Sequence, residues 1–255
     1  MSRDVTQRFS DRVANYVRYR PGYPVELIDT LRQRTKLSAT STIADIGSGT
    51  GIFTALLLPH AGSVQAVEPN EPMRAYAEST LGNDARFKSI GAPAEATPLP
   101  DGSVDLITVA QAFHWLDPVA ARREFARILK PGGYVALIWN ERLTDTTPFL
   151  RDYENLLKTA ATDYNQVNHM NIDHAAIAAF YAPAPFETFT FANRQQFDRA
   201  GLIGRALSSS YVPNAGQPGH DAFLAGLNGI FDRHAVNGSV AFDYETKLHL
   251  GRLTV

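Results

Sequence analysis

A glycine-rich segment with the sequence Gly-Ser-Gly-Thr-Gly at residues 47–51 directly follows the apolar run 42–46, and it constrains the fold more than any other feature. A short buried strand that leads into a glycine turn and then a helix opens many ligand-binding α/β folds. A dinucleotide fingerprint needs its third glycine at position 52, where this chain has Ile52, and the Lys-Ser or Lys-Thr pair of a P-loop is also absent. The glycines still allow backbone N–H groups to approach a ligand at the N-terminus of the following helix. The spacing therefore predicts a ligand-binding turn of neither the NAD nor the ATP phosphate-loop class.

Short apolar runs alternate with helical patterns along most of the chain, which predicts an α/β fold with a parallel sheet and crossover helices. The runs expected to form strands are residues 42–46, 63–67, 85–90, 104–110, 134–139, 186–191 and 241–250. Helices are expected at residues 52–58, 71–81, 118–129, 147–160, 172–181 and 220–234. Residues 130–133, Lys-Pro-Gly-Gly, should end the third of these helices. Because ligands of open α/β sheets bind beyond the carboxyl ends of the strands, the functional site is expected there.

The composition is that of an ordinary globular protein, with 255 residues, 44% hydrophobic content and a formal net charge of −2. Such a charge gives no attraction for nucleic acid or an anionic membrane, so small neutral or anionic ligands are the expected partners. No apolar stretch approaches the ~20 residues that cross a bilayer, and the first residues lack a signal-peptide core, so a cytoplasmic protein is expected. The chain has no cysteine and its histidines lack metal-binding spacing, so neither thiolate chemistry nor metal dependence is expected.

A carboxylate stands at the end of the second expected strand, at Glu68, about 20 residues beyond the first glycine. A carboxylate at this offset accepts hydrogen bonds from both hydroxyls of a ribose and repels a 2′-phosphate. The offset favours a ribose-binding role for Glu68 over its alternative role as a solvated or capping residue.

Several motifs in order make the sequence resemble the class I S-adenosylmethionine-dependent methyltransferases. They are residues 43–51 (Ile-Ala-Asp-Ile-Gly-Ser-Gly-Thr-Gly), Glu68, residues 94–105 (Ala-Glu-Ala-Thr-Pro-Leu-Pro-Asp-Gly-Ser-Val-Asp) and the turn 129–133 (Leu-Lys-Pro-Gly-Gly). The resemblance implies a Rossmann-like fold: a seven-stranded, mostly parallel sheet with an antiparallel last pair, helices on both faces and an N-terminal helical cap. It also implies S-adenosyl-L-methionine as methyl donor and S-adenosyl-L-homocysteine as product.

The same resemblance assigns roles to individual residues around the donor. The backbone of Gly47, Ser48 and Gly49 would pass under the methionyl part, with Asp45 near its ammonium group. The other residues expected to bind the cofactor are Gly51, Glu68 at the ribose, Asn70 and Met73 at the adenine, and the backbone around Ala94. Many relatives carry an Asp where this chain has Pro93, so the backbone of residues 92–94 is expected to meet the adenine amino group instead.

Residues 110–117, Ala-Gln-Ala-Phe-His-Trp-Leu-Asp, follow the fourth expected strand and form the expected active-centre loop. Gln111, His114 and Trp115 would emerge close to the transferred methyl group, with Gln111 at the cofactor. His114 could remove a proton from an acceptor, since imidazole titrates near neutral pH, or it could hydrogen-bond to shape the loop. Trp115 could line the substrate pocket or pack as core.

The N-terminal segment 9–24 resembles the cap of a subgroup of small-molecule methyltransferases that includes trans-aconitate methyltransferase-like proteins. There Tyr16 and Arg20 could close over the cofactor, Arg20 as a bidentate partner for its carboxylate; the alternative is a helix with its aromatic face on the core. Tyr211, in a segment similar to the same subgroup, could reach the acceptor. The expected organisation is one domain over residues 1–255, comprising a cap (1–35), a cofactor-binding core (36–141), and a substrate roof with the closing strands (142–255).

The sequence thus predicts a methyltransferase for a small-molecule acceptor, which could be methylated on carboxylate, hydroxyl or carbon. Two alternatives stay open: a non-catalytic S-adenosylmethionine-binding protein and a nucleotide-dependent oxidoreductase. The oligomeric state and the acceptor are not encoded in any motif.

Overall fold

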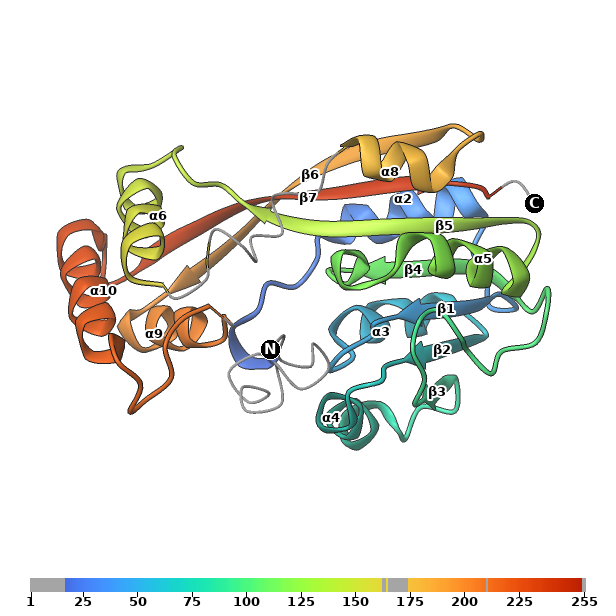
Figure 1. The fold of residues 1–255 in the computed structure, drawn as a ribbon, viewed down its shortest axis with the longest axis horizontal. Coiled ribbons are helices and arrows are strands. Elements are labelled where there is room, and N and C mark those ends of the chain that lie inside the picture. The colour runs from blue at the N-terminus through green and yellow to red at the C-terminus, as the bar shows by residue number, and fades with distance from the viewer. Residues whose placement is uncertain (1–16, 162–163, 165–173, 210, 254–255) are drawn as a thin grey trace.

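The centre of the protein is a seven-stranded sheet in the order β3-β2-β1-β4-β5-β7-β6 (Figure 1). A computed structural model describes residues 17–161, 164, 174–209 and 211–253. The strands are β1 (Thr42–Ile46), β2 (Ser63–Val67), β3 (Phe87–Ile90), β4 (Val104–Ala110), β5 (Leu129–Arg142), β6 (Phe186–Phe197) and β7 (Val240–Gly251). β1 to β5 pair in parallel, whereas β7 is antiparallel to both of its neighbours. The predicted class of sheet is therefore confirmed.

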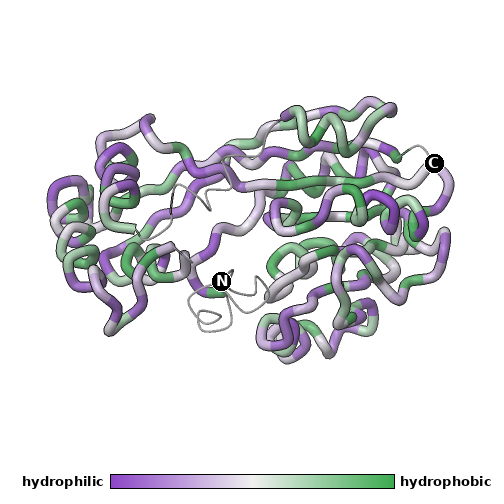
Figure 2. Tube along the Cα trace, in the orientation of Figure 1, coloured by the Kyte–Doolittle hydropathy of each residue, from purple (hydrophilic) through white to green (hydrophobic). Residues whose placement is uncertain are grey.

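Helices cover both faces of this sheet. The described helices are α2 (Val25–Thr35), α3 (Ile52–Leu57), α4 (Glu71–Leu81), α5 (Pro118–Ile128), α6 (Pro148–Ala160), α8 (His174–Tyr181), α9 (Arg199–Leu207) and α10 (His220–His234). On β5, Leu137 and Trp139 pack with α5 and α8, while Ala136 and Ile138 pack with α2 and α3. Such strands, buried on both faces, explain the continuous apolar runs in the sequence, visible as green stretches of the tube in Figure 2.

The helices α6, α9 and α10 form a separate lobe at one end of the molecule (Figure 1). β6 and β7 carry this lobe, because their pairing continues to Phe197 opposite Val240, beyond the last β5–β7 pair, Arg142 opposite Tyr244. The lobe has its own hydrophobic core, in which Tyr153, Phe223 and Phe242 are fully buried. The sequence predicted β6 to end at residue 191; the strand continues because β7 supplies backbone partners as far as Phe197.

The expected turn at residues 130–133 is instead part of β5. α5 ends at Ile128, and the pairing with β4 shifts from Val104 opposite Leu129 to Leu106 opposite Tyr134, so the extra residues form a bulge. Gly133 is required there, since a Cβ would lie 2.8 Å from the Leu129 side chain. The structure describes the cap segment expected at residues 9–24 only from residue 17 onward, and the start of the helix expected from residue 172 lies outside the described residues. None of the described helices has the length and apolar character needed to cross a membrane.

Candidate active site

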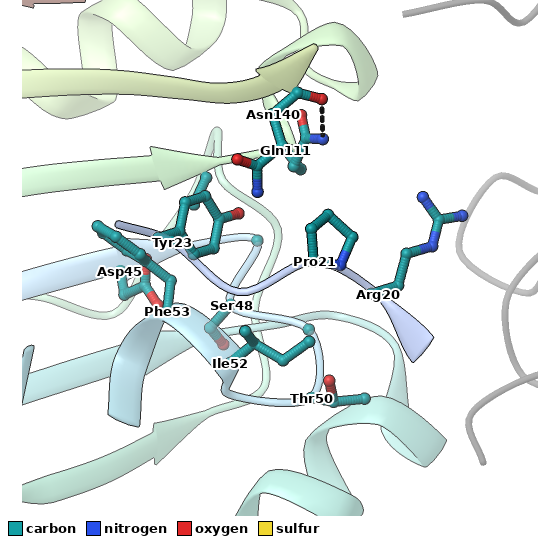
Figure 3. Close-up of a pocket in the computed structure, with 13 residues that line it drawn as sticks. Arg20, Pro21, Tyr23, Asp45, Ser48, Thr50, Ile52, Phe53, Gln111 and Asn140 are labelled. Carbon is teal, nitrogen blue, oxygen red and sulfur yellow. Dashed lines mark hydrogen bonds between the residues drawn. The ribbon is translucent and has the colours of Figure 1, made fainter. Parts of the chain in front are cut away.

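A pocket opens at the carboxyl ends of β1, β4 and β5, between the glycine turn and the segment Arg20–Tyr23 (Figure 3). Six of the residues expected to hold the cofactor line it: Arg20, Asp45, Gly47, Ser48, Gly49 and Gln111. They come from three separate parts of the chain. The sheet therefore brings half of the twelve residues predicted for the donor site to the edge where α/β folds bind ligands.

The glycine turn is held by hydrogen bonds to the end of β2. The N–H groups of Gly47 and Ser48 both donate to Val67 O, at 2.8 and 3.1 Å, and Gly49 N–H donates to Glu68 Oε2 at 2.9 Å. Gly47 adopts a φ of 65°, and a Cβ there would lie 2.5 Å from Ala112 Cβ. These three N–H groups therefore already donate hydrogen bonds within the protein. The turn lets a ligand lie close to the backbone, but it does not present the free N–H donors that the sequence suggested.

Asp45 is a buried carboxylate at the floor of the pocket, with an exposed fraction of 1%. It accepts hydrogen bonds from Thr54 Oγ1 at 2.6 Å and from Thr108 Oγ1 at 2.7 Å. Burial raises the pKa of Asp45 to about 6, although both hydroxyls favour the charged form. A carboxylate that is costly to keep charged in this place is well suited to a cationic ligand group.

Glu68 lies against the glycine turn and does not line the pocket. Besides the bond from Gly49, its Oε1 accepts from Asn70 N–H at 2.7 Å, and burial raises its pKa. Asn70 caps α4 by accepting from Met73 N–H at 3.0 Å. The Met73 sulfur would lie 3.9 Å from a Cβ at Gly49. The ribose and adenine residues of the prediction are therefore clustered beside the turn, and their roles toward a ligand stay predictions.

Two uncharged polar atoms at the pocket lack hydrogen-bond partners within the described part of the chain. They are the buried hydroxyl of Thr50 and Gln111 Oε1. Gln111 also has a φ of 58°, unusual for a residue with a side chain, and its Nε2 donates to Asn140 O at 3.2 Å. Buried polar groups without partners are costly, and strained backbone persists mainly at functional sites. Both features indicate that this pocket is built for a polar ligand.

His114 and Trp115 lie in a short 3-10 turn (Phe113–Trp115) after β4, with ring centroids 4.6 Å apart. Neither lines the pocket at the glycine turn. Burial, with the nearby positive charge of Arg20, lowers the pKa of His114 to about 4. The imidazole is consequently neutral at pH 7, and it is a weaker base than the sequence alone suggested.

The segment Arg20–Tyr23 is tied to the far strands of the sheet. Gly22 O accepts from Asn140 Nδ2 at 3.1 Å and from Asn193 Nδ2 at 2.9 Å, and Asn140 Oδ1 accepts from Thr246 Oγ1. Tyr23 packs edge-on against Phe53 of α3, at 4.8 Å between ring centroids. This network fixes the segment as one wall of the pocket, in the position that the predicted cap would occupy.

Three other predicted residues, among those that the structure describes, do not line this pocket. Gly51 caps α3, where a Cβ would lie 2.7 Å from the Leu81 side chain, so its smallness serves helix packing. Ala94 is buried in the hydrophobic core. Tyr211 lies in the lobe against Tyr164, with ring centroids 4.9 Å apart. Tyr16 lies outside the described residues.

The sequence interpretation missed seven lining residues: Pro21, Tyr23, Thr50, Ile52, Phe53, Ala110 and Asn140. Thr50 and Ile52 lie in or beside the glycine motif, and Asn140 follows the apolar run of a parallel strand, so the rule on strand ends could have found them. No local pattern marks Tyr23. Within the described residues, no group of three or more His, Cys, Asp or Glu side chains is placed to hold a metal ion.

The reversed strand β7, between β5 and β6, distinguishes this sheet from the all-parallel sheet of a dinucleotide-binding domain. With a glycine turn after β1 and an acid after β2, it defines the class I, Rossmann-like methyltransferase fold. Comparison with known proteins agrees: residues 44–137 match the family described as "Methyltransferase domain". Residues 44–137 therefore resemble a methyltransferase domain, and the sheet that contains them has the class I fold of S-adenosylmethionine-dependent methyltransferases.

Individual relatives support this assignment. An uncharacterized methyltransferase of Mycobacterium tuberculosis is 40% identical over 140 residues, which cover 55% of this chain and 55% of the relative. The chain spans about half the length of the curated relatives it matches. A candidate type II methyltransferase from Anaeromyxobacter dehalogenans has the same fold, with a TM-score of 0.66 and 21% identity over 93% of this chain and all of that one (100%). A candidate S-adenosyl-L-methionine-dependent methyltransferase from Methanococcus maripaludis gives a TM-score of 0.54 and 22% identity, over 74% of this chain and 91% of that one.

Proposed function

We propose that this chain transfers a methyl group from S-adenosyl-L-methionine to a small-molecule acceptor. The observation that supports it most is the meeting of three groups at one pocket: the buried carboxylate of Asp45, the Thr50 hydroxyl and Gln111 Oε1. The last two have no hydrogen-bond partner among the residues that the structure describes. Asp45 would face the ammonium of the methionyl group, and Thr50 and Gln111 would hydrogen-bond to its polar atoms. The formal net charge of −2 supports a small acceptor over a nucleic acid.

When bound, this cofactor supplies a methyl group that is already activated on a sulfonium. What remains for the chain is to hold the acceptor in line and to exclude water, which can contribute several kcal/mol through positioning. The wall formed by Arg20–Tyr23 and the floor formed by the glycine turn enclose the donor end. His114 and Trp115, on the loop after β4, would then face the acceptor.

The proposal is tested by calorimetric titration with S-adenosyl-L-methionine, S-adenosyl-L-homocysteine and NADH, followed by a mass-spectrometric screen for methylated small molecules. We expect both sulfur compounds to bind, NADH not to bind, and at least one acceptor to gain a methyl group. Binding of NADH alone would overturn the proposal. Tight cofactor binding with no methyl transfer across a broad acceptor screen would favour a binding protein instead.

Asp45 predicts a specific pH dependence of cofactor binding. Because the pKa of Asp45 is about 6, its carboxylate should be charged above that pH and protonated below it. The affinity for S-adenosyl-L-homocysteine is therefore expected to be full at neutral pH and to fall as the pH drops through about 6. In D45N the affinity should be low at every pH. Titration calorimetry across this pH range checks both results, and an unaltered affinity in D45N would remove Asp45 from the site.

The raised pKa of Asp45 also predicts how the stability of the fold changes with pH. Folded Asp45 holds its proton more tightly than the unfolded chain does, so the charged form destabilises the fold as the pH rises from about 4 to about 6. D45N is thus expected to be at least as stable as the parent protein at neutral pH. Loss of binding with retained or increased stability in urea unfolding would separate a ligand-binding role from a structural one.

His114 is expected to contribute little as a general base. Removing a true general base costs about 100-fold or more in turnover, and an effective base has a pKa near the working pH. Since the pKa of His114 is about 4, H114A should lower kcat by less than ~10-fold. The pH profile should also show no step near the ordinary histidine value of 6.5. H60A is a suitable control, because His60 precedes β2 and lies at the opposite end of the strands. A loss of ~100-fold or more that is accompanied by such a step would establish His114 as the base.

A further inference from the structure

Arg205 of α9 is a buried cation in the lobe, and no carboxylate of the described residues forms an ion pair with it. Its exposed fraction is 6%, and its Nε and Nη1 donate to two neutral hydroxyls, Tyr244 Oη at 3.3 Å and Ser209 Oγ at 3.1 Å. The guanidinium also lies 5.9 Å from the ring centroid of Phe242. No ion pair of Arg205 is found within the described residues. An arginine cannot shed its charge, so this arrangement leaves a full positive charge uncompensated in an apolar core.

Arg142, the other buried arginine of the lobe, has its charge balanced by a carboxylate. Arg142 is equally buried, but Glu154 Oε2 lies 2.5 Å from its Nη2, and Tyr164 and Tyr153 complete its surroundings. This pair is electrically neutral. Among the described residues, the interior of the lobe therefore carries one excess positive charge, and Arg205 is its source.

The charge of Arg205 is connected to the donor pocket through a short series of contacts. Arg205 binds Ser209, and the carbonyl of the preceding residue, Ser208, accepts from Arg20 Nη2 at 3.1 Å. Arg20 lines the pocket at the glycine turn, and Figure 3 shows its guanidinium extending away from that turn. Arg20 thus joins the donor pocket to the segment that positions Arg205.

We propose that Arg205 is an anchoring site for a carboxylate group of the methyl acceptor. This inference rests on the proposed function and names the class of its substrate: a small molecule with a carboxylate separate from the atom that is methylated. A guanidinium matches a carboxylate in geometry and charge, and Tyr244 and Ser209 can orient its fork. A single excess charge is balanced by one carboxylate, whereas a phosphate group would bring up to two negative charges.

The test is a binding panel that uses small carboxylates as probes. Acetate, malonate, succinate, glutarate, benzoate and hexanoate are each paired with the corresponding amide, and binding is followed by thermal shift and calorimetry in the presence of S-adenosyl-L-homocysteine. At least one carboxylate should bind saturably while its amide does not. Binding should weaken by at least ~30-fold in R205M and R205K, because truncating one partner of a buried charge pair has an effect of this size. The matched control is R199M, which removes a half-exposed arginine of the same helix that is already paired with Asp232.

A second readout separates ligand binding from a structural role. Replacing an uncompensated buried charge by an apolar side chain of similar size is commonly neutral or stabilising, so R205M is expected to unfold at the same or a higher temperature. If R205M fails to fold, R205K and the comparison of each carboxylate with its amide still decide the question. The inference is overturned if no carboxylate binds, if binding is equal in R205M and the parent, or if inorganic phosphate binds in place of the carboxylates. Retained binding of S-adenosyl-L-homocysteine in such a case would leave the proposed function standing.

Discussion

Replacing Gly47 by alanine is expected to abolish measurable binding of S-adenosyl-L-homocysteine and to destabilise the fold. Gly47 has a φ of 65°, and the new Cβ would lie 2.5 Å from Ala112 Cβ, at the start of the loop that carries His114. The left-handed conformation costs an alanine ~1 kcal/mol, and overpacking of this kind costs ~1–3 kcal/mol more. To relieve the clash, either the glycine turn or the loop after β4 must move, and both border the pocket. Urea unfolding and titration calorimetry measure the two effects.

Gly132 provides the matched control for the conformational part of this effect. It has a φ of 82°, but a Cβ there would meet nothing within 4 Å. G132A should therefore cost ~1 kcal/mol and leave cofactor affinity unchanged. If G47A resembled G132A in both measurements, the close approach of the turn to Ala112 would have no role in binding.

The donor side of the site could be predicted from the sequence because its determinants are local. The apolar run 42–46, the glycines that follow and the offset of Glu68 lie within one strand-turn-helix-strand segment, and the structure forms that segment at these residues. The local pattern could not predict which hydrogen bonds hold the glycine turn in place. Gly49 N–H donates to Glu68, so these two motifs bind each other in addition to facing one edge of the sheet.

The pocket wall at Arg20–Tyr23 and the lobe could not be predicted because they depend on contacts between distant segments. Asn140 and Asn193 both donate to Gly22 O, from 118 and 171 positions away, and Thr246 donates to Asn140 Oδ1. No periodicity in the sequence encodes this convergence. The extension of β6 to Phe197 likewise depends on β7 as a partner. No sequence pattern distinguishes Arg205 from the other arginines. Only the structure shows that its side chain is buried without an ion-pair partner among the described residues.

Glu154 is the site where a single substitution should destabilise the lobe most. Its carboxylate accepts from Arg142 Nη2 at 2.5 Å and from Tyr164 Oη at 2.7 Å, and its exposed fraction is 5%. E154A would leave Arg142 buried and without its counter-charge, and breaking a buried pair in this way costs ~3–5 kcal/mol. Cofactor affinity of the folded protein should not change, because Glu154 lies outside the pocket at the glycine turn. Urea unfolding measures the loss.

E141A is the control for this prediction, since Glu141 pairs with Lys247 at 2.6 Å in a half-exposed setting next to Arg142. Exposed pairs of this kind contribute ~0–1 kcal/mol, so E141A should be nearly neutral.

The pKa of Glu154 predicts how the effect of E154A depends on pH. Burial alone would raise this pKa, but the hydrogen bonds from Arg142 and Tyr164 outweigh burial and lower the pKa below the ordinary 4.5. The stabilisation is therefore present above that pH and is lost as the pH falls through the folded-state pKa, so E154A and the parent should converge in acid. The two buried arginines of the lobe therefore predict different effects on stability. E154A, which disrupts the neutral Arg142–Glu154 pair, should destabilise the lobe, whereas R205M, which removes the uncompensated charge, should not. If E154A proved as mild as E141A, the Arg142 charge would be compensated elsewhere, and the count of one excess charge on which the carboxylate site depends would have to be revised.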